Sequence, residues 1–85
     1  METRIALIGI IVENVEVVES VNQILHEYGK YIVGRMGIPY KEKGVSIISI
    51  VIDADNNTIS SLSGKLGMLE GINVKTVYSK YGKER

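Results

Sequence analysis

Hydrophobic residues recur along this chain with two different spacings, and the changes between them predict the order of strands and helices. Residues 4–12 are apolar at nearly every position, which is typical of a strand buried on both faces of a sheet. From Val15 to Tyr28 the apolar residues recur every three or four positions, as in an amphipathic helix. Asn14 is a suitable N-cap for this helix, and Gly29 is placed to end it.

The middle of the chain predicts a β-hairpin. Residues 31–38 are rich in strand-forming residues, although Gly34 and Gly37 interrupt them, and Pro39 closes the segment. Residues 45–53 form a longer apolar run of Val, Ile and Ser. The short segment between the two runs is charged and ends in glycine, as a hairpin connection does.

The last part of the chain repeats the helix and strand patterns. After a polar turn, Ile and Leu residues recur at three and four positions from Ile59 to Leu69, which predicts a second amphipathic helix that ends at Gly71. Residues 72–78 alternate between apolar and polar, the pattern of a half-buried strand. Residues 79–85 are a polar tail that we expect to fray.

The predicted order is strand–helix–strand–strand–helix–strand. With right-handed crossovers this order gives the split βαβ arrangement, so we expect an α+β, ferredoxin-like βαββαβ fold. Its antiparallel sheet would have four strands, with two helices on one face, in a single domain over residues 1–85. The two most apolar strands fall in the centre. The strands that carry Arg35, Pro39 and Lys75 fall at the edges, where such residues are tolerated.

This arrangement leaves one face of the sheet without a cover. In the strand at 45–53 the isoleucines at even positions point one way, while Val45, Ile47 and Val51 point the other way. An apolar face left in water usually marks an interface. We therefore predict a homodimer or tetramer that buries this face or extends the sheet edge to edge.

Composition excludes several classes of function. Lys+Arg and Asp+Glu number 10 each, and this balance gives no general attraction to nucleic acid or to an anionic membrane. The chain has no Cys, which excludes disulfides, thiolate metal sites and Cys nucleophiles and is compatible with the cytoplasm, where we place the protein. No apolar run is long enough to span a bilayer. No catalytic constellation is present, so we expect a protein that is not an enzyme and has no cofactor.

Candidate ligand residues lie at two places in the sequence. Arg35 is flanked by Gly34 and Gly37, where the backbone is accessible, so it could face an anionic ligand at a subunit edge. The alternative is an edge-strand charge that blocks aggregation. Glu13 and Asn14, at the end of the first strand, complete the candidate surface.

Metal binding has weaker support in the sequence. His26 is the one histidine, and it would need partners from a neighbouring subunit to hold a metal. A surface or partly packed histidine is the favoured alternative. Asp53 and Asp55 supply oxygen ligands, but no Glu completes a calcium loop, so a turn and a helix cap are favoured there. Gly9 interrupts a central strand, as happens where a ligand or another backbone approaches.

Three segments together carry a resemblance to a known family. They are Gly-Arg-Met-Gly-Ile-Pro-Tyr at 34–40, Ser-Gly-Lys-Leu-Gly at 63–67 and Gly-Ile-Asn-Val-Lys at 71–75. In these segments, and over nearly its whole length, the chain resembles the ACT-like regulators of iron-only hydrogenase systems. The resemblance implies a ferredoxin-like, ACT-type fold, self-association and a regulatory role tied to iron-only hydrogenase production.

A more distant similarity is to the ligand-sensing C-terminal domain of the nickel-responsive repressor. Only the region around His26 matches that domain, and residues such as Ile38 and Tyr40 stand where the other nickel ligands would be. No nickel site is therefore expected. No residues remain for the DNA-binding arm of the repressor, so we expect no direct contact with nucleic acid.

Three functional hypotheses follow from the sequence. The first is a non-enzymatic, ACT-like regulatory module that forms a homo-oligomer and binds a small effector or a protein of the hydrogenase system. The second is a metal sensor that uses His26 across a subunit interface. The third is a structural subunit of a hydrogenase-related complex, without a ligand.

Overall fold

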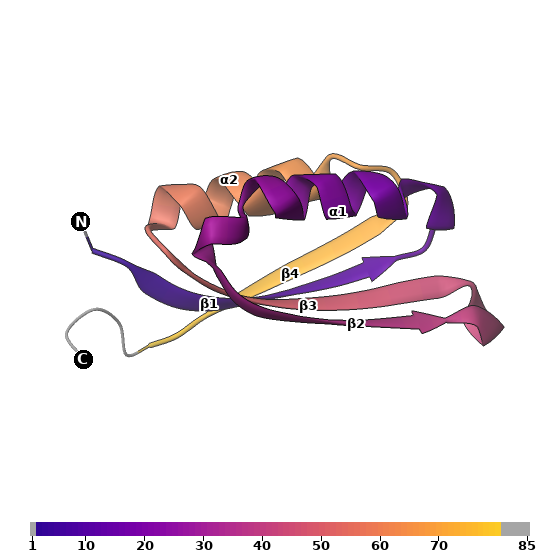
Figure 1. The fold of residues 1–85 in the computed structure, drawn as a ribbon, viewed down its shortest axis with the longest axis horizontal. Coiled ribbons are helices and arrows are strands. Elements are labelled where there is room, and N and C mark those ends of the chain that lie inside the picture. Colours follow the sequence, from indigo (N-terminus) through magenta and orange to yellow (C-terminus); the bar gives the residue numbers. More distant parts are fainter. Residues whose placement is uncertain (1, 81–85) are drawn as a thin grey trace.

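The computed structural model describes residues 2–80, and its elements follow the predicted order (Figure 1). The strands are β1 (Arg4–Val12), β2 (Ile32–Tyr40), β3 (Val45–Ala54) and β4 (Ile72–Tyr78). The helices are α1 (Val18–Glu27) and α2 (Asn56–Gly67). Short 3-10 turns precede α1, follow it, and join β2 to β3: Val15–Val17, Gly29–Tyr31 and Lys41–Lys43.

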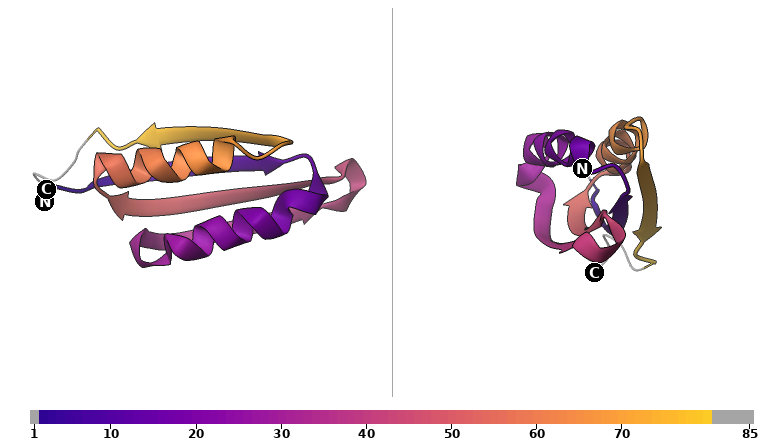
Figure 2. Two further views of the ribbon diagram at one scale, coloured as in Figure 1. Left: turned by 90° about the horizontal axis from the view of Figure 1, so that it is seen from above. Right: turned by 90° about the vertical axis from the view of Figure 1, so that its right-hand side faces the viewer.

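The strands form one antiparallel sheet in the order β2-β3-β1-β4. The most apolar strands, β1 and β3, are central, and β2 and β4 are the edges, as predicted. Both helices lie side by side on the same face of the sheet (Figure 2). The ferredoxin-like βαββαβ fold is therefore confirmed.

The core lies between the helices and the even-numbered residues of the two central strands. The register pairs Ile8 with Ile50 and Ile10 with Ile48, so these side chains share the face that the helices cover. Burying one such side chain contributes about 1.5–3 kcal/mol. The buried members are Ala6, Ile8, Ile10, Val12, Val21, Leu25, Tyr28, Ile48, Ile50, Ile52, Ala54, Ile59, Leu62 and Leu66.

The first helical segment begins differently from the prediction. The Asn14 Oδ1 atom accepts a hydrogen bond from the Glu16 backbone N–H at 3.0 Å. Asn14 is thus the cap of the 3-10 turn Val15–Val17, and the α-helix begins only at Val18. The cap residue was correctly identified from the sequence, but the conformation of the first turn was not.

The second helix has a well-formed start and an early end. Asp55 Oδ1 accepts from the Thr58 backbone N–H at 3.0 Å, and hydrogen bonds from Thr58 hold the pKa of Asp55 below its ordinary value of 3.8. The helix ends at Gly67, so the prediction that it ends at Gly71 is wrong. Gly71 instead has φ of 74° in the turn before β4. A Cβ there would lie 2.7 Å from the Cβ of Asn14, so both conformation and space require glycine.

Strand β2 extends further than predicted, because its edge position tolerates Pro39. A register shift between Ile32 and Gly34 marks an irregularity near the start of the strand. Beyond it, Gly34 pairs with Val51 and Arg35 pairs with Ile50. Residues paired across antiparallel strands share a face, so Arg35 lies on the helix side and Gly34 on the opposite side.

The predicted polar tail is anchored at its first residue. The Ser79 backbone N–H donates to the Ile5 carbonyl at 2.9 Å, and Arg4 Nη2 donates to the Ser79 carbonyl at 3.2 Å. The fraying of residues 79–85 stays a prediction, and residues 81–85 lie outside the described residues. Among residues 2–80, no helix has the length and apolar character needed to cross a membrane.

Candidate functional site

One face of the sheet is apolar and uncovered by any helix or strand of residues 2–80. In Figure 1 both helices lie above the sheet, and this face points down. We call it the open face. Its apolar side chains are 36–62% exposed, and they are Ile5, Leu7, Ile11, Met36, Ile38, Tyr40, Ile47, Val51 and Val77. Exposed apolar side chains gathered on one face in this way are typical of an interaction site.

The two central strands carry little side-chain bulk at the middle of the open face, where Ser49 pairs with Gly9. The register aligns one residue of each strand across it: Met36, Ser49, Gly9 and Lys75. A Cβ added at Gly9 would meet only the Lys75 carbonyl oxygen, at 4.0 Å, so packing within the chain does not require glycine there. The neighbouring rows carry larger side chains, such as Ile11 on one side and Leu7 on the other.

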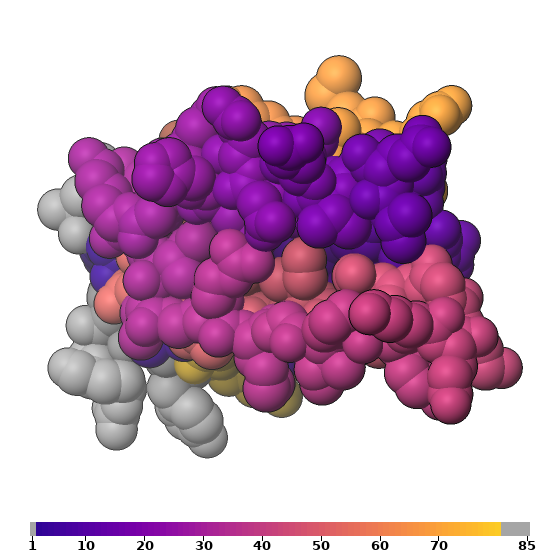
Figure 3. All heavy atoms as spheres, turned by 45° about the vertical axis from the view of Figure 1, so that its right-hand side comes forward, coloured from indigo at the N-terminus to yellow at the C-terminus, as the bar shows by residue number. Residues whose placement is uncertain are grey.

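A second surface lies between helix α1 and edge strand β2. Arg35 Nη2 donates a hydrogen bond to Asn22 Oδ1 at 2.9 Å and so connects the two elements. On one side of this bond is a hollow of about 350 Å³ that also includes Leu25, His26, Gly29 and Ile32. On the other side is a hollow of about 250 Å³ that also includes Val18, Gly37, Ile38, Pro39, Ser46 and Ile48. We call the two hollows together the α1–β2 groove; Figure 3 shows this side of the molecule.

Arg35 is the arginine of the α1–β2 groove. It lines both hollows, and among residues 2–80 no Asp or Glu lines either of them. Within residues 2–80 Arg35 takes part in no ion pair; the ion pair between Lys65 and Glu27, at 3.7 Å, joins the two helices instead. An arginine in this state has donors available for an anion.

The structure separates the candidate ligand residues into groups. Arg35 and Gly37 line the groove, whereas Gly34 lies on the open face. Glu13 is at the far end of β1, where its carboxylate accepts from Asn73 Nδ2 at 3.2 Å. Its backbone N–H also donates to the Gly71 carbonyl at 2.7 Å. Glu13 and Asn14 therefore do not meet Arg35 within one chain, because they follow the end of β1, and β3 lies between β1 and β2.

Comparison with known proteins gives a family for this chain. Residues 4–76 match the family described as "TM1266-like: Iron-only hydrogenase system regulator, putative". The chain belongs to this family. The solved structure described as "The structure of uncharacterized protein TM1266 from Thermotoga maritima" is 40% identical in sequence and has a TM-score of 0.89. The match covers 93% of this chain and 100% of that chain, whereas no curated protein matches.

The TM1266-like match confirms the resemblance to regulators of iron-only hydrogenase systems. The likeness to ACT domains and to the nickel-responsive repressor remains a prediction.

In this TM1266-like fold, two residues join Arg35 that sequence reasoning did not associate with it. Asn22 and His26 lie four positions apart on α1 and both line the groove. Side chains with this spacing share one side of a helix, so the pairing of these two residues was available from the sequence. Their meeting with Arg35 was not, because it depends on where α1 lies over the sheet. Among residues 2–80, no group of three or more His, Asp or Glu is arranged to hold a metal ion.

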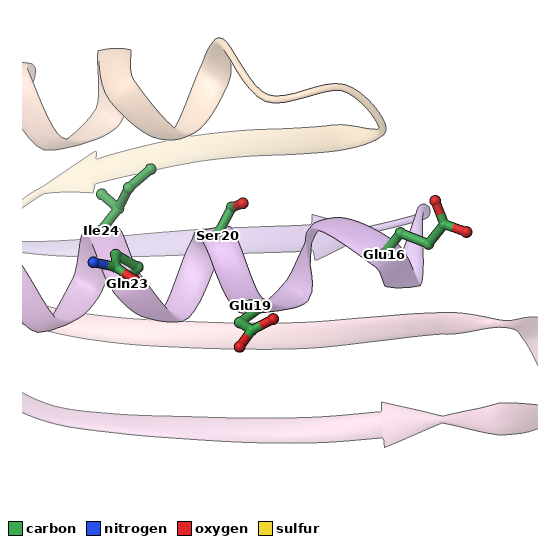
Figure 4. Close-up of a pocket in the computed structure, with 5 residues that line it drawn as sticks. All are labelled: Glu16, Glu19, Ser20, Gln23 and Ile24. Atoms are coloured by element: carbon green, nitrogen blue, oxygen red, sulfur yellow. The ribbon is translucent and has the colours of Figure 1, made fainter.

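Another hollow, of about 410 Å³, offers no comparable site. Its lining residues all come from α1 and the turn before it, and they are Glu16, Glu19, Ser20, Gln23 and Ile24. Figure 4 shows these side chains pointing in different directions from the helix. Within residues 2–80 no second element lines this hollow, so we assign it no function.

Proposed function

We propose that this chain is a non-enzymatic, ACT-like regulatory module of an iron-only hydrogenase system and acts as a homo-oligomer. The description of the TM1266-like family supports the regulatory role. The open face is the observation that supports action through binding, because a regulator without catalytic groups acts through the molecules that it binds. The module would respond to a small effector or contact a protein of the hydrogenase system.

The open face comes close to the size that a stable dimer needs. The nine residues of β1 span about 30 Å, and four strands span about 19 Å, which gives roughly 570 Å² before side-chain relief is counted. Stable interfaces bury roughly 800 Å² on each partner. A contact that uses most of the open face therefore approaches the size of a stable interface.

A second copy of the chain suits this surface electrostatically. A two-fold contact places the same patch on both sides, so the patch must be complementary to itself. The charged residues that β3 and β4 place on the open face, Asp53 and Lys75, have opposite signs. The strands therefore bring no excess of either charge to a contact between two copies.

Self-association is tested with two matched charge substitutions. Leu7→Glu places a carboxylate on the open face, where Leu7 is 45% exposed, and Met68→Glu places one on the turn after α2, where Met68 is 86% exposed. Light scattering at micromolar concentration should give a dimer or tetramer for the original protein and for Met68→Glu. Leu7→Glu should be a folded monomer by circular dichroism. A monomeric original protein would refute the homo-oligomer.

The regulatory role is tested in the host. The gene is replaced by the Leu7→Glu or Met68→Glu version, and iron-only hydrogenase activity and transcript levels are measured. We expect the Leu7→Glu strain to resemble a deletion strain and the Met68→Glu strain to resemble the parent. Unchanged hydrogenase levels in the deletion strain would contradict the regulatory role, whatever the oligomeric state.

A further inference from the structure

The larger hollow of the α1–β2 groove places Arg35, which makes no ion pair within residues 2–80, beside the half-buried apolar side chain of Ile32. It lies on the helix side of the sheet, whereas the open face lies on the other side. We propose that this hollow binds a small organic carboxylate, with the carboxylate on Arg35 and a short apolar chain on the floor. The regulatory meaning of such binding rests on the proposed function, whereas the site itself lies within one chain.

Arg35 supplies the charge and the geometry for a carboxylate. A guanidinium has five N–H donors in a planar fork and binds a carboxylate through two parallel hydrogen bonds. One bond of Arg35 goes to Asn22 Oδ1, at 2.9 Å, and within residues 2–80 the guanidinium makes no ion pair. The remaining donors are therefore available to a bound anion.

Helix α1 fixes the guanidinium and adds further donors. The hydrogen bond to Asn22 ties the long Arg35 side chain to the helix, which lowers the entropy cost of ordering it around a ligand. Because the Asn22 oxygen is the acceptor of this bond, its amide N–H groups remain as donors. His26, one helical turn further on, lines the same hollow.

The floor of the hollow favours an organic anion over an inorganic one. Ile32 is half-buried and presents apolar surface to the hollow, and the core residue Leu25 lies beneath it. Gly29 leaves its end of the hollow open, since a Cβ there would have no atom within 4 Å. A volume of about 350 Å³ is within the range of small-molecule sites and exceeds the needs of a bare oxyanion.

Three probes separate the contributions of charge and apolar contact. Isovalerate carries both a carboxylate and a branched chain, isoamyl alcohol carries the chain without the charge, and inorganic phosphate carries the charge without the chain. Each is titrated into ¹⁵N-labelled protein and followed by amide chemical shifts. Isovalerate should move the amides of Asn22, Gly29, Ile32 and Arg35, with an apparent Kd at least tenfold lower than that of either other probe.

Two variants test the assigned residue. Arg35→Gln should raise the apparent Kd for isovalerate at least tenfold. The apparent Kd of Arg35→Lys should lie between those of the original protein and Arg35→Gln, because lysine keeps the charge without the planar fork. Lys41→Gln removes the same charge from the turn between β2 and β3 and should leave the titration unchanged. Arg35 is exposed, so the variants should keep the core chemical shifts of the original protein.

Several outcomes would overturn the site. An equal response to isoamyl alcohol would remove the role of charge, and an equal response to phosphate would remove the role of the floor. If isovalerate changes only amide chemical shifts on the open face, or changes none, the site does not lie in the α1–β2 groove. Oligomeric state is measured in the same samples by light scattering. If a monomeric protein binds isovalerate, the carboxylate site stands and the homo-oligomer is refuted. If a dimeric protein shows no response to isovalerate, the homo-oligomer stands and the carboxylate site is refuted.

Discussion

The two faces of the sheet are built from the same residue types on the same strands, yet only one is buried. Ile10 is 1% exposed beneath the helices, and its neighbour Ile11 is 43% exposed on the open face. On β3, Ile50 is fully buried and Val51 is 36% exposed. The hydrophobic residues on both faces predict that both are covered. The two helices of the chain, however, cover only one face of the sheet. The difference between the faces is what points to a second copy of the chain.

The largest expected effect comes from substituting adjacent isoleucines on the two faces. Ile10→Ala should lower the free energy of unfolding by about 2–5 kcal/mol, because it leaves a cavity in the core. Ile11→Ala should lower the stability of the monomer by less than about 1 kcal/mol, because its side chain is already partly in water. Urea unfolding at several protein concentrations measures both.

Concentration dependence separates the two isoleucine variants further. The loss in Ile10→Ala should be the same at every protein concentration, whereas the loss in Ile11→Ala should grow where the original protein is associated. Equal losses for both variants in dilute protein would mean that the open face is buried within one chain.

A smaller effect is expected at the centre of the open face. Gly9→Val fits the fold, because the nearest atom to an added Cβ is 4.0 Å away, and valine suits a strand. It should nevertheless raise the dissociation constant of the proposed dimer about tenfold, equivalent to about 1.4 kcal/mol, because it adds bulk where two copies would approach in the proposed contact. Analytical ultracentrifugation gives the constant.

Gly64→Ala is the control for Gly9→Val. Gly64 lies within α2, on the other side of the sheet, and an added Cβ there has no atom within 4 Å. The substitution should stabilise the helix by about 0.5–1 kcal/mol without changing association. Equal dissociation constants for Gly9→Val and the original protein would place the contact away from β1.

The smallest effect concerns the cap of α2, on the covered side. Hydrogen bonds from Thr58 lower the pKa of Asp55 below 3.8, so the ionised cap adds stability above that value. This stability is lost as the pH falls through the lowered pKa of the folded state. Asp55→Asn keeps an acceptor but does not titrate in this range. In thermal melts below pH 4, the variant should therefore lose less stability than the original protein does. Parallel pH profiles for the two proteins would contradict this role of Asp55.

Most of the fold followed from hydrophobic periodicity. The order of the elements and the central positions of β1 and β3 were predicted correctly, because uninterrupted apolar strands belong in the middle of a sheet. The ends of the helices and strands were predicted less accurately. Gly71 has the residue type of a helix end, but its role as a tight contact beside Asn14 depends on the turn between α2 and β4.

The candidate sites were predicted less completely than the fold. Arg35 and Gly37 do line one groove, but Glu13 lies two strands away at another end of the sheet. Sequence spacing does not give these distances, since they follow from strand order and register. His26 was considered as a metal ligand, yet its position beside Arg35 follows from the packing of α1.

The claim that two open faces pack together is tested most directly by cross-linking, because the chain has no cysteine of its own. Ser49→Cys places one thiol at the centre of the open face, and Ser60→Cys places one on exposed α2. Packed sheets lie about 10 Å apart, so a bifunctional maleimide of about that span should join two copies through Ser49→Cys. Far more cross-linked dimer from Ser49→Cys than from Ser60→Cys is the predicted result. Equal or smaller yields from Ser49→Cys would contradict it.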